Sequence, residues 1–409
     1  MTCEVAVMNK RGIALAADSA VTLTDGAGNN RKNYYTAEKL FSLSPALPVA
    51  IMTYGPAEIM GVPWETVVKI YAQKLGGRQF DALSGYAGDF LGFIEGATWL
   101  FPAEAQSREF QSLVYSVWSG LYREELEKLM KEQPGHSAKG QLAALAEIIE
   151  RDHQEWLAYE DLQGVPPDYG ALILKTYQDV LDEVEQKVFA DIKLSAPLKA
   201  ALRKTVRFMV EKEWFHPADQ SNVVIAGMGE AEPFPVLLQY HVGTIAAGKL
   251  RYARKDESRI GGTIDASVIP FAQDDIIHSI IGGIHPRVFR QIIEHTARAL
   301  PGDGKAGKAD DPERIREREK KLTESVHEHV LGQYAEPILS AVSALPRKDL
   351  VRMAEALVNL TAFLMRMTVG EDETVAEPID VALLSKGDGF IWVRHKELRT
   401  IARGGHDSD

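Results

Sequence analysis

Alternating apolar and polar positions open the chain. The segment C-E-V-A-V-M at 3–8 alternates, and a second alternating run at 13–17 follows a polar N-K-R-G break. This pattern predicts a β-hairpin with a glycine-containing turn. The start of the first strand should then lie beside the end of the second, which brings Thr2 close to Asp18.

A second hairpin and a further strand are predicted next. The dipeptide D-G at 25–26 lies in a polar loop, and the chain returns through E-K-L-F-S-L at 38–43. Lys39 on the returning strand can therefore approach the end of the first hairpin. The apolar run at 49–52 predicts another strand, and Gly55 in the T-Y-G-P-A-E segment after it is expected to open a helix.

Two long stretches have the periodicity of helices. Residues 64–216 carry apolar side chains at helical spacing, and residues 286–367 do the same apart from a polar loop at 301–312 and a break at Pro346. Five of the six tryptophans fall within the first stretch. We expect them to pack a helical layer, with a partner or substrate surface as the alternative interpretation.

Thr2 is the candidate catalytic nucleophile. Removal of Met1 would free its α-amine, so that one residue would carry a hydroxyl nucleophile and a base. Such an amine titrates near pH ~7.7–8.0, and a nearby Lys39 cation would lower its pKa further. The thiol of Cys3 is an alternative nucleophile, but Cys3 lacks the free amine, and packing within the strand is the preferred interpretation.

These residues resemble the start of an N-terminal-nucleophile (Ntn) hydrolase of the proteasome β-subunit family, which includes the bacterial heat-shock peptidase and the ancestral-β-subunit group. The family's catalytic threonine lies sixteen positions before the aspartate of an A-A-D-S type motif, which matches Thr2 and Asp18 here. The resemblance assigns the family's lysine to Lys39 in E-K-L-F. It assigns the oxyanion glycine to Gly55.

The resemblance extends to residues that support the threonine amine. It assigns the family's supporting aspartate to Glu373, with Asp372 as the alternative. The two supporting serines of the family fall on Ala376 and Gly283, so neither position holds a serine here. The implied catalytic set is therefore Thr2 with the residues matched above and Glu373.

The fold that this resemblance implies is α+β, a four-layer αββα sandwich of the proteasome-like Ntn type with large helical insertions. Residues 1–409 would form a single domain in which 64–216 is a helical insertion and 286–367 is a second helical region. The segment that begins at 221–229 resembles the family's central hairpin, and residues 378–395 resemble its closing β-hairpin.

The composition indicates which partners and which compartment to expect. The 409 residues are 45% hydrophobic and carry a formal net charge of −12, which disfavours nucleic acid as a partner. No apolar run is long enough to span a membrane and no secretory leader is evident, so we expect a soluble cytoplasmic protein. The single cysteine excludes an intrachain disulfide. We expect no cofactor and no metal.

The function that the sequence favours is that of a threonine peptidase acting on peptide or other amide substrates. Family members form closed rings, so the resemblance also implies a homo-oligomer. Two alternatives remain open. One is a catalytically silent proteasome-like scaffold or binding protein, and the other is a small-molecule amidase of the same fold.

Overall fold

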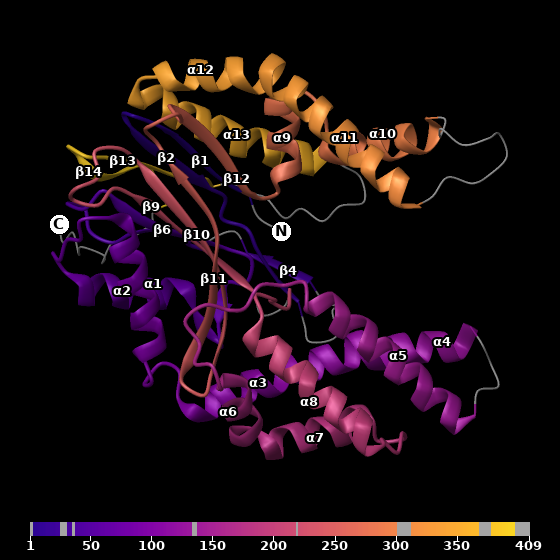
Figure 1. Cartoon of the computed structure of the whole chain (residues 1–409). Coiled ribbons are helices and arrows are strands. Elements are labelled where there is room, and N and C mark those ends of the chain that lie inside the picture. Colours follow the sequence, from indigo (N-terminus) through magenta and orange to yellow (C-terminus); the bar gives the residue numbers. More distant parts are fainter. Residues whose placement is uncertain are drawn as a thin grey trace, which may run out of the picture.

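The computed structural model of the chain describes residues 3–24, 31–34, 37–132, 137–217, 220–300, 312–367 and 378–396 (Figure 1). Two five-stranded antiparallel sheets form its centre. Helices cover them on both sides.

The first sheet is built from both ends of the described chain. Its strand order is β12-β1-β2-β13-β14. The strands are β12 (Ala266–Ala272), β1 (Cys3–Asn9), β2 (Gly12–Ala17), β13 (Asp380–Ser385) and β14 (Gly389–Arg394). The predicted first hairpin is confirmed, with Glu4 opposite Ala17. The closing hairpin is also confirmed, and it places Asp380 opposite Ala17 from the other side.

The second sheet has the order β11-β10-β9-β6-β5 and includes the predicted central hairpin. Its strands are β11 (Lys249–Arg259), β10 (Val236–Ala246), β9 (Ser221–Gly227), β6 (Val49–Tyr54) and β5 (Leu40–Ser42). Two small hairpins accompany the sheets. They are β3 (Val21–Thr24) with β4 (Arg31–Tyr34), and β7 (Glu58–Ile59) with β8 (Val62–Pro63).

The two sheets pack against each other through an apolar cluster. On β2, Ile13, Leu15 and Ala17 belong to this cluster, whereas Ala14 and Ala16 belong to a cluster shared with helices. Successive residues of a strand point to opposite faces, so a strand that is buried on both faces has no polar alternation. This explains the apolar run G-I-A-L-A-A, which is fully buried.

Helices cover the outer face of each sheet (Figure 1). The helices α1 (Trp64–Leu75) and α2 (Leu83–Gly96) pack on the second sheet. The first sheet is covered by α13 (Arg347–Met367), together with α12 (Glu336–Ala344) and α9 (Asp274–Gly282). The chain therefore has an α+β fold with antiparallel sheets, as predicted.

Most of the predicted helical stretch 64–216 forms a cluster of its own, at the end of the β10–β11 hairpin (Figure 1). Among the tryptophans of the stretch 64–216, Trp118 and Trp156 are buried in this cluster, which confirms packing for these two, whereas Trp99 is 66% exposed. Its elements are α3 (Ala103–Val117), the π-helix η1 (Trp118–Glu124), α4 (Glu125–Glu132), α5 (Ala138–Trp156), α6 (Tyr169–Thr176), α7 (Gln178–Val188) and α8 (Ala196–Glu211).

The second helical region begins earlier than predicted, because α9 precedes residue 286. It continues with α10 (Pro286–Ala299), α11 (Pro312–Val330) and the π-helix η2 (Leu331–Ala335) before α12 and α13. The break expected at Pro346 is confirmed, since it lies between α12 and α13.

The expectation that Gly55 opens a helix is wrong. The hairpin β7–β8 follows Gly55, and α1 begins only at Trp64. Gly55 and Val62 both precede prolines, and the residue before a proline is disfavoured in the helical region. Met60 and Gly61 have φ angles of 51° and 76°, which suits the two-residue turn of a hairpin.

Gly389, at the start of β14, offers a test of how tightly the closing hairpin is packed. Its φ is +70°, and a Cβ added there would lie 2.3 Å from the carbonyl oxygen of Pro45. We expect Gly389→Ala to lower the free energy of unfolding by about 2–4 kcal/mol, measured by urea denaturation. Gly387→Ala in the same turn is the matched control, because a Cβ there meets nothing within 4 Å. Equal losses in both variants would contradict this account.

Candidate active site

Asp18 is fixed at the end of β2 by the backbone of the first strand. The Asp18 N–H donates to the Cys3 carbonyl at 3.1 Å. The Cys3 N–H donates in return to Asp18 Oδ1 at 3.0 Å, and the Ala20 N–H donates to Asp18 Oδ2 at 3.0 Å. The Asp18 side chain is fully buried. The N–H of Cys3 belongs to the peptide bond that joins Thr2 to Cys3, so Asp18 binds the chain directly beside Thr2.

Lys39 reaches this carboxylate from the second sheet. Its Nζ lies 2.7 Å from Asp18 Oδ1, and its side chain is only 7% exposed. The Lys39 carbonyl accepts a hydrogen bond from the Thr53 N–H at 2.9 Å, which fixes the segment before β5 against β6. The structure thus brings two of the predicted site residues into a buried ion pair between the sheets.

Glu4 is a member of this cluster that the sequence analysis did not identify. Its Oε1 lies 3.5 Å from Lys39 Nζ, and its side chain is fully buried. The strand register places Glu4 opposite Ala17, the residue before Asp18. The signal was present in the sequence, because a lone acidic residue within an apolar strand of a hairpin must find a charged partner when it is buried.

Gly55 directly follows β6 and has a φ of +91°, a conformation that favours glycine. A Cβ at this position would meet the Gln220 carbonyl oxygen at 3.3 Å and Asn222 Nδ2 at 3.4 Å. Glycine therefore suits both the backbone angle and the close approach of the segment around β9.

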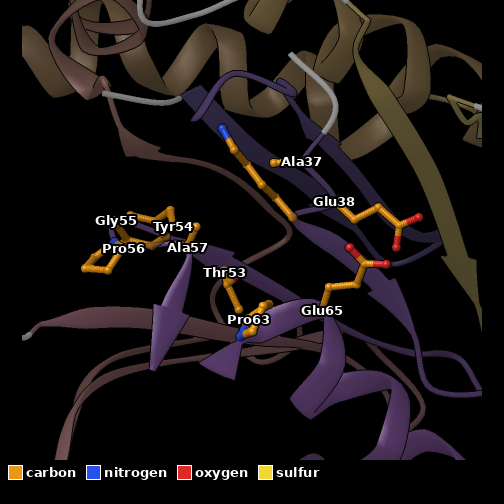
Figure 2. Close-up of a pocket in the computed structure, with 10 residues that line it drawn as sticks. Ala37, Glu38, Thr53, Tyr54, Gly55, Pro56, Ala57, Pro63 and Glu65 are labelled. Atoms are coloured by element: carbon orange, nitrogen blue, oxygen red, sulfur yellow. The ribbon is translucent and has the colours of Figure 1, made fainter. Parts of the chain in front are cut away.

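Gly55 and Lys39 line one pocket of about 110 Å³ (Figure 2). The other lining residues come from the segments around β5, β6 and β8: Ala37, Glu38, Thr53, Tyr54, Pro56, Ala57, Pro63 and Glu65. A pocket of this size accommodates one small group rather than a drug-sized ligand. Glu38 and Glu65 add negative charge, and each forms an ion pair with Lys69, at 2.7 and 2.6 Å.

Two of the proposed catalytic residues, Thr2 and Glu373, lie outside the described residues, as do Asp372 and Ala376. Gly283 is described. It ends α9 in the left-handed conformation, with φ +69°, and a Cβ there would lie 3.0 Å from Cδ1 of the Tyr334 ring. Gly283 is thus a helix-capping glycine at a position where a serine would be strained.

The side chain of Cys3 lies on the face of β1 opposite to that of Glu4. Its side chain is fully buried in the cluster that β1 and β2 share with α13. Burial is the main reason why the pKa of its thiol is raised far above the ordinary value, and the charge of Glu4 adds to this effect. The thiolate is therefore strongly disfavoured, which confirms packing as the role of Cys3.

Three polar side chains, those of Gln220, Asn222 and His241, form a hydrogen-bonded cluster near Gly55. His241 Nδ1 lies 2.8 Å from Asn222 Oδ1 and 2.6 Å from Gln220 Nε2. Burial lowers the pKa of His241 to about 4, and the charge of Lys255 contributes further. In the unfolded chain the imidazole has its ordinary pKa near 6.5. As the pH falls below 6.5, the unfolded state therefore binds a proton that the folded state does not bind until about pH 4.

The protein should consequently lose stability between pH 6.5 and 4. We expect His241→Gln to reduce this loss by on the order of 1 kcal/mol, since solvent screens the partly buried ring. Urea denaturation at pH 7 and pH 4.5 measures the difference. His278→Gln, at a side chain that is 52% exposed, should leave the loss unchanged. The same pH dependence in wild type and His241→Gln would show that His241 does not cause it.

Two further observations concern cofactors and membranes. In the parts of the chain that the structure describes, no three His, Cys, Asp or Glu side chains are grouped so that they could hold a metal ion. None of the described helices is both long enough and apolar enough to cross a membrane.

No protein-family model and no curated protein matches this chain. Among solved structures it is similar to Anbu from Hyphomicrobium sp. strain MC1, with 10% identity over 96% of this chain and 86% of that one, at a TM-score of 0.28. It is also similar to Anbu (ancestral beta-subunit) from Yersinia bercovieri, with 11% identity over 96% and 87% of the two chains, at a TM-score of 0.24. At such TM-scores neither likeness supports a conclusion about this chain.

Proposed function

We propose that the chain is a threonine-type N-terminal-nucleophile hydrolase, with the αββα sandwich of that class, that cleaves amide bonds in peptides. The observation that carries this proposal is the buried pair of Lys39 and Asp18, 2.7 Å apart, beside the peptide bond that joins Thr2 to Cys3. A buried charge destabilises a fold unless it is paired and hydrogen-bonded, and ionisable groups in such environments concentrate at functional sites.

The reaction needs Thr2 at the N-terminus after removal of Met1. The Thr2 hydroxyl attacks the substrate carbonyl, and its own α-amine takes the hydroxyl proton directly or through a water. The tetrahedral intermediate collapses when the ammonium returns that proton to the leaving nitrogen. Water then attacks the Thr2 ester, again with the amine as base, and releases the acid.

Lys39 has an electrostatic role in this scheme, because a cation beside the amine disfavours the ammonium form. Asp18 orients Lys39 and also binds the N–H of Cys3. Asp18 and Glu4 lie 2.7 and 3.5 Å from the same ammonium, so both carboxylates offset part of the lysine charge. The lowering of the amine pKa should therefore be smaller than Lys39 alone would give.

The other proposed roles belong to Gly55 and Glu373. The backbone N–H of Gly55 would stabilise the oxyanion, an effect typically of about 2.7–4 kcal/mol for one donor. Its place in the same pocket as Lys39 supports this role. Glu373 would orient the Thr2 amine, which stays a proposal from the family resemblance.

The experiment that tests the proposal combines an intact mass with an activity assay. A mass that lacks Met1, together with hydrolysis of fluorogenic peptides, supports it. A processed chain that cleaves neither peptides nor small acyl amides would instead identify a catalytically silent scaffold. Cleavage of small amides alone would assign the amidase alternative.

We also propose that the chain assembles with copies of itself, in a ring if it follows the family that it resembles. A peptidase that acted on any unfolded chain would need its sites enclosed. Light scattering tests this, and a 45.2 kDa monomer at every concentration would contradict it.

A further inference from the structure

The closing hairpin brings a third buried carboxylate to the site. The strand register places Asp380 of β13 opposite Ala17, and Glu4 of β1 opposite the same residue from the other side. Residues directly opposite each other in a sheet share one face. Asp380 is 1% exposed, so this carboxylate also needs a positive partner or hydrogen-bond donors.

Its partner is Lys396, just beyond β14. Lys396 Nζ lies 3.0 Å from Asp380 Oδ2, and the Lys396 N–H donates to Asp380 Oδ1 at 2.9 Å. His395 Nδ1 lies 3.2 Å from the same oxygen, and its ring stacks on Trp392 with centroids 4.1 Å apart. These contacts hold the residues after β14 against the start of β13.

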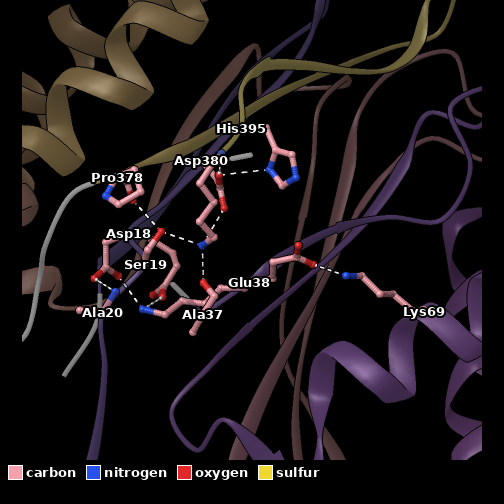
Figure 3. Close-up of polar contacts among 12 residues, drawn as sticks. Asp18, Ser19, Ala20, Ala37, Glu38, Lys69, Pro378, Asp380 and His395 are labelled. Carbon is pink, nitrogen blue, oxygen red and sulfur yellow. Dashed lines mark hydrogen bonds and ion pairs between the residues drawn. The ribbon is translucent and has the colours of Figure 1, made fainter. Parts of the chain in front are cut away.

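The Lys396 ammonium also contacts both segments that carry the proposed catalytic pair (Figure 3). It donates to Ser19 Oγ at 2.6 Å, and it donates to the carbonyl oxygen of Ala37. Ser19 directly follows Asp18, and Ala37 lies two residues before Lys39. The Ala37 N–H donates to the Ser19 carbonyl at 3.3 Å, which joins the same two segments a second time.

The three protons of an ammonium suit this arrangement, since Lys396 has three acceptors, on Asp380, Ser19 and Ala37. Its side chain is 10% exposed. The Lys396 ammonium therefore joins the end of β2, in the first sheet, to the segment before β5, in the second sheet. Asp18 and Lys39 project from these same two segments.

We propose that Lys396, held by Asp380, is a positioning residue that sets the separation of Asp18 and Lys39 and so aligns the site. This inference rests on the proposed hydrolase function for its kinetic consequence. Lys396 acts through the backbone and Ser19, and it does not touch the reacting atoms. Active sites need such support, because misplacement by about 1 Å can cost on the order of 100-fold in rate.

The test compares Lys396→Met with Lys386→Met. Lys386 lies in the turn of the same hairpin and donates to two backbone carbonyls, those of Gly229 and Glu230, at 2.6 and 2.7 Å. The two lysines differ in place, because the strands between them put Lys386 at the opposite end of the hairpin from the site. Each variant loses one charge and the hydrogen bonds of one ammonium to backbone carbonyls, and Lys396→Met additionally removes the partner of the buried Asp380 carboxylate.

We expect Lys396→Met to lower kcat by about 10- to 100-fold with KM changed by less than about 3-fold, while Lys386→Met keeps the wild-type kcat. Lys396→Arg should recover part of the lost kcat, because it restores the charge and donors. Ser19→Ala, which leaves the Lys396–Asp380 pair in place, should lower kcat only a few-fold. If Lys396→Met does not fold, Ser19→Ala carries the test, and an unchanged kcat there overturns the proposal.

Amide hydrogen exchange separates this inference from the proposed function. In Lys396→Met, peptides that contain residues 18–20 and 37–39 should exchange faster, and in Lys386→Met they should not. This result would support positioning even if the processed wild type showed no hydrolysis. Unchanged exchange in both segments, or equal losses of kcat and thermal stability in the two lysine variants, would overturn it.

Discussion

Thr2→Ala should abolish amide hydrolysis, with a loss in kcat of about 10⁴-fold or more, because no other group in the scheme supplies the nucleophile. Thr2→Ser keeps the hydroxyl and the amine and should retain partial activity. Cys3→Ala should change kcat by no more than a few-fold, since its thiol is buried on the opposite face of β1. Steady-state kinetics on one fluorogenic peptide measure all three variants.

Each of these variants needs its intact mass recorded, because a retained Met1 would block the amine and imitate the loss of the nucleophile. The circular dichroism spectrum of Thr2→Ala should match that of the wild type. If Thr2→Ala kept full hydrolysis while Cys3→Ala lost it, the assignment of the nucleophile would be wrong.

Lys39→Met should lose both activity and stability. Two buried carboxylates, Asp18 and Glu4, would then lack their shared cation, and breaking a buried ion pair from one side costs about 3–5 kcal/mol. We expect a loss of that size in urea denaturation, with hydrolysis reduced to background. Lys69→Met is the matched control. That lysine pairs with two glutamates at the same pocket but is 52% exposed, so the variant should lose less than about 1 kcal/mol.

The double variant Lys39→Met with Asp18→Asn separates the structural from the chemical contribution of Lys39. Removal of one carboxylate charge should recover part of the stability, while hydrolysis stays at background because the cation is still missing. Recovery of hydrolysis together with stability would mean that Lys39 serves the fold only.

Much of the first sheet could be predicted from sequence because hairpin pairing is local. The polar break between the two runs predicts that the ends of the first hairpin meet, and the Asp18 N–H does donate to the Cys3 carbonyl. Thr2 itself lies outside the described residues. The predicted second hairpin is wrong in its returning strand, because β4 pairs with β3 whereas β5 pairs with β6 in the second sheet. Lys39 still approaches Asp18, but it does so across the space between the two sheets.

Contacts between distant segments could not be predicted in this way. Nothing in the order of residues near Asp18 indicates that Lys396 donates to Ser19, because that contact depends on how β13 pairs with β2. The helix expected at Gly55 was wrong for a local reason, since two X-Pro steps delay helix formation until Trp64. The alternation around Glu4 predicts a strand, but it does not indicate that both faces of that strand are buried.

The pairing of β13 with β2 also has a consequence for the newly made protein. Chains are synthesised from the N-terminus at roughly 5–20 residues per second, so on the order of a minute separates Ser19 from Lys396 on the ribosome. During that interval β2 can pair with β1 but lacks its other neighbour β13, and the ammonium that joins Ser19 to Ala37 does not yet exist. An incomplete chain therefore cannot assemble this network, and a hydrolase that depends on it would stay inactive until residues 378–396 have been made and have folded.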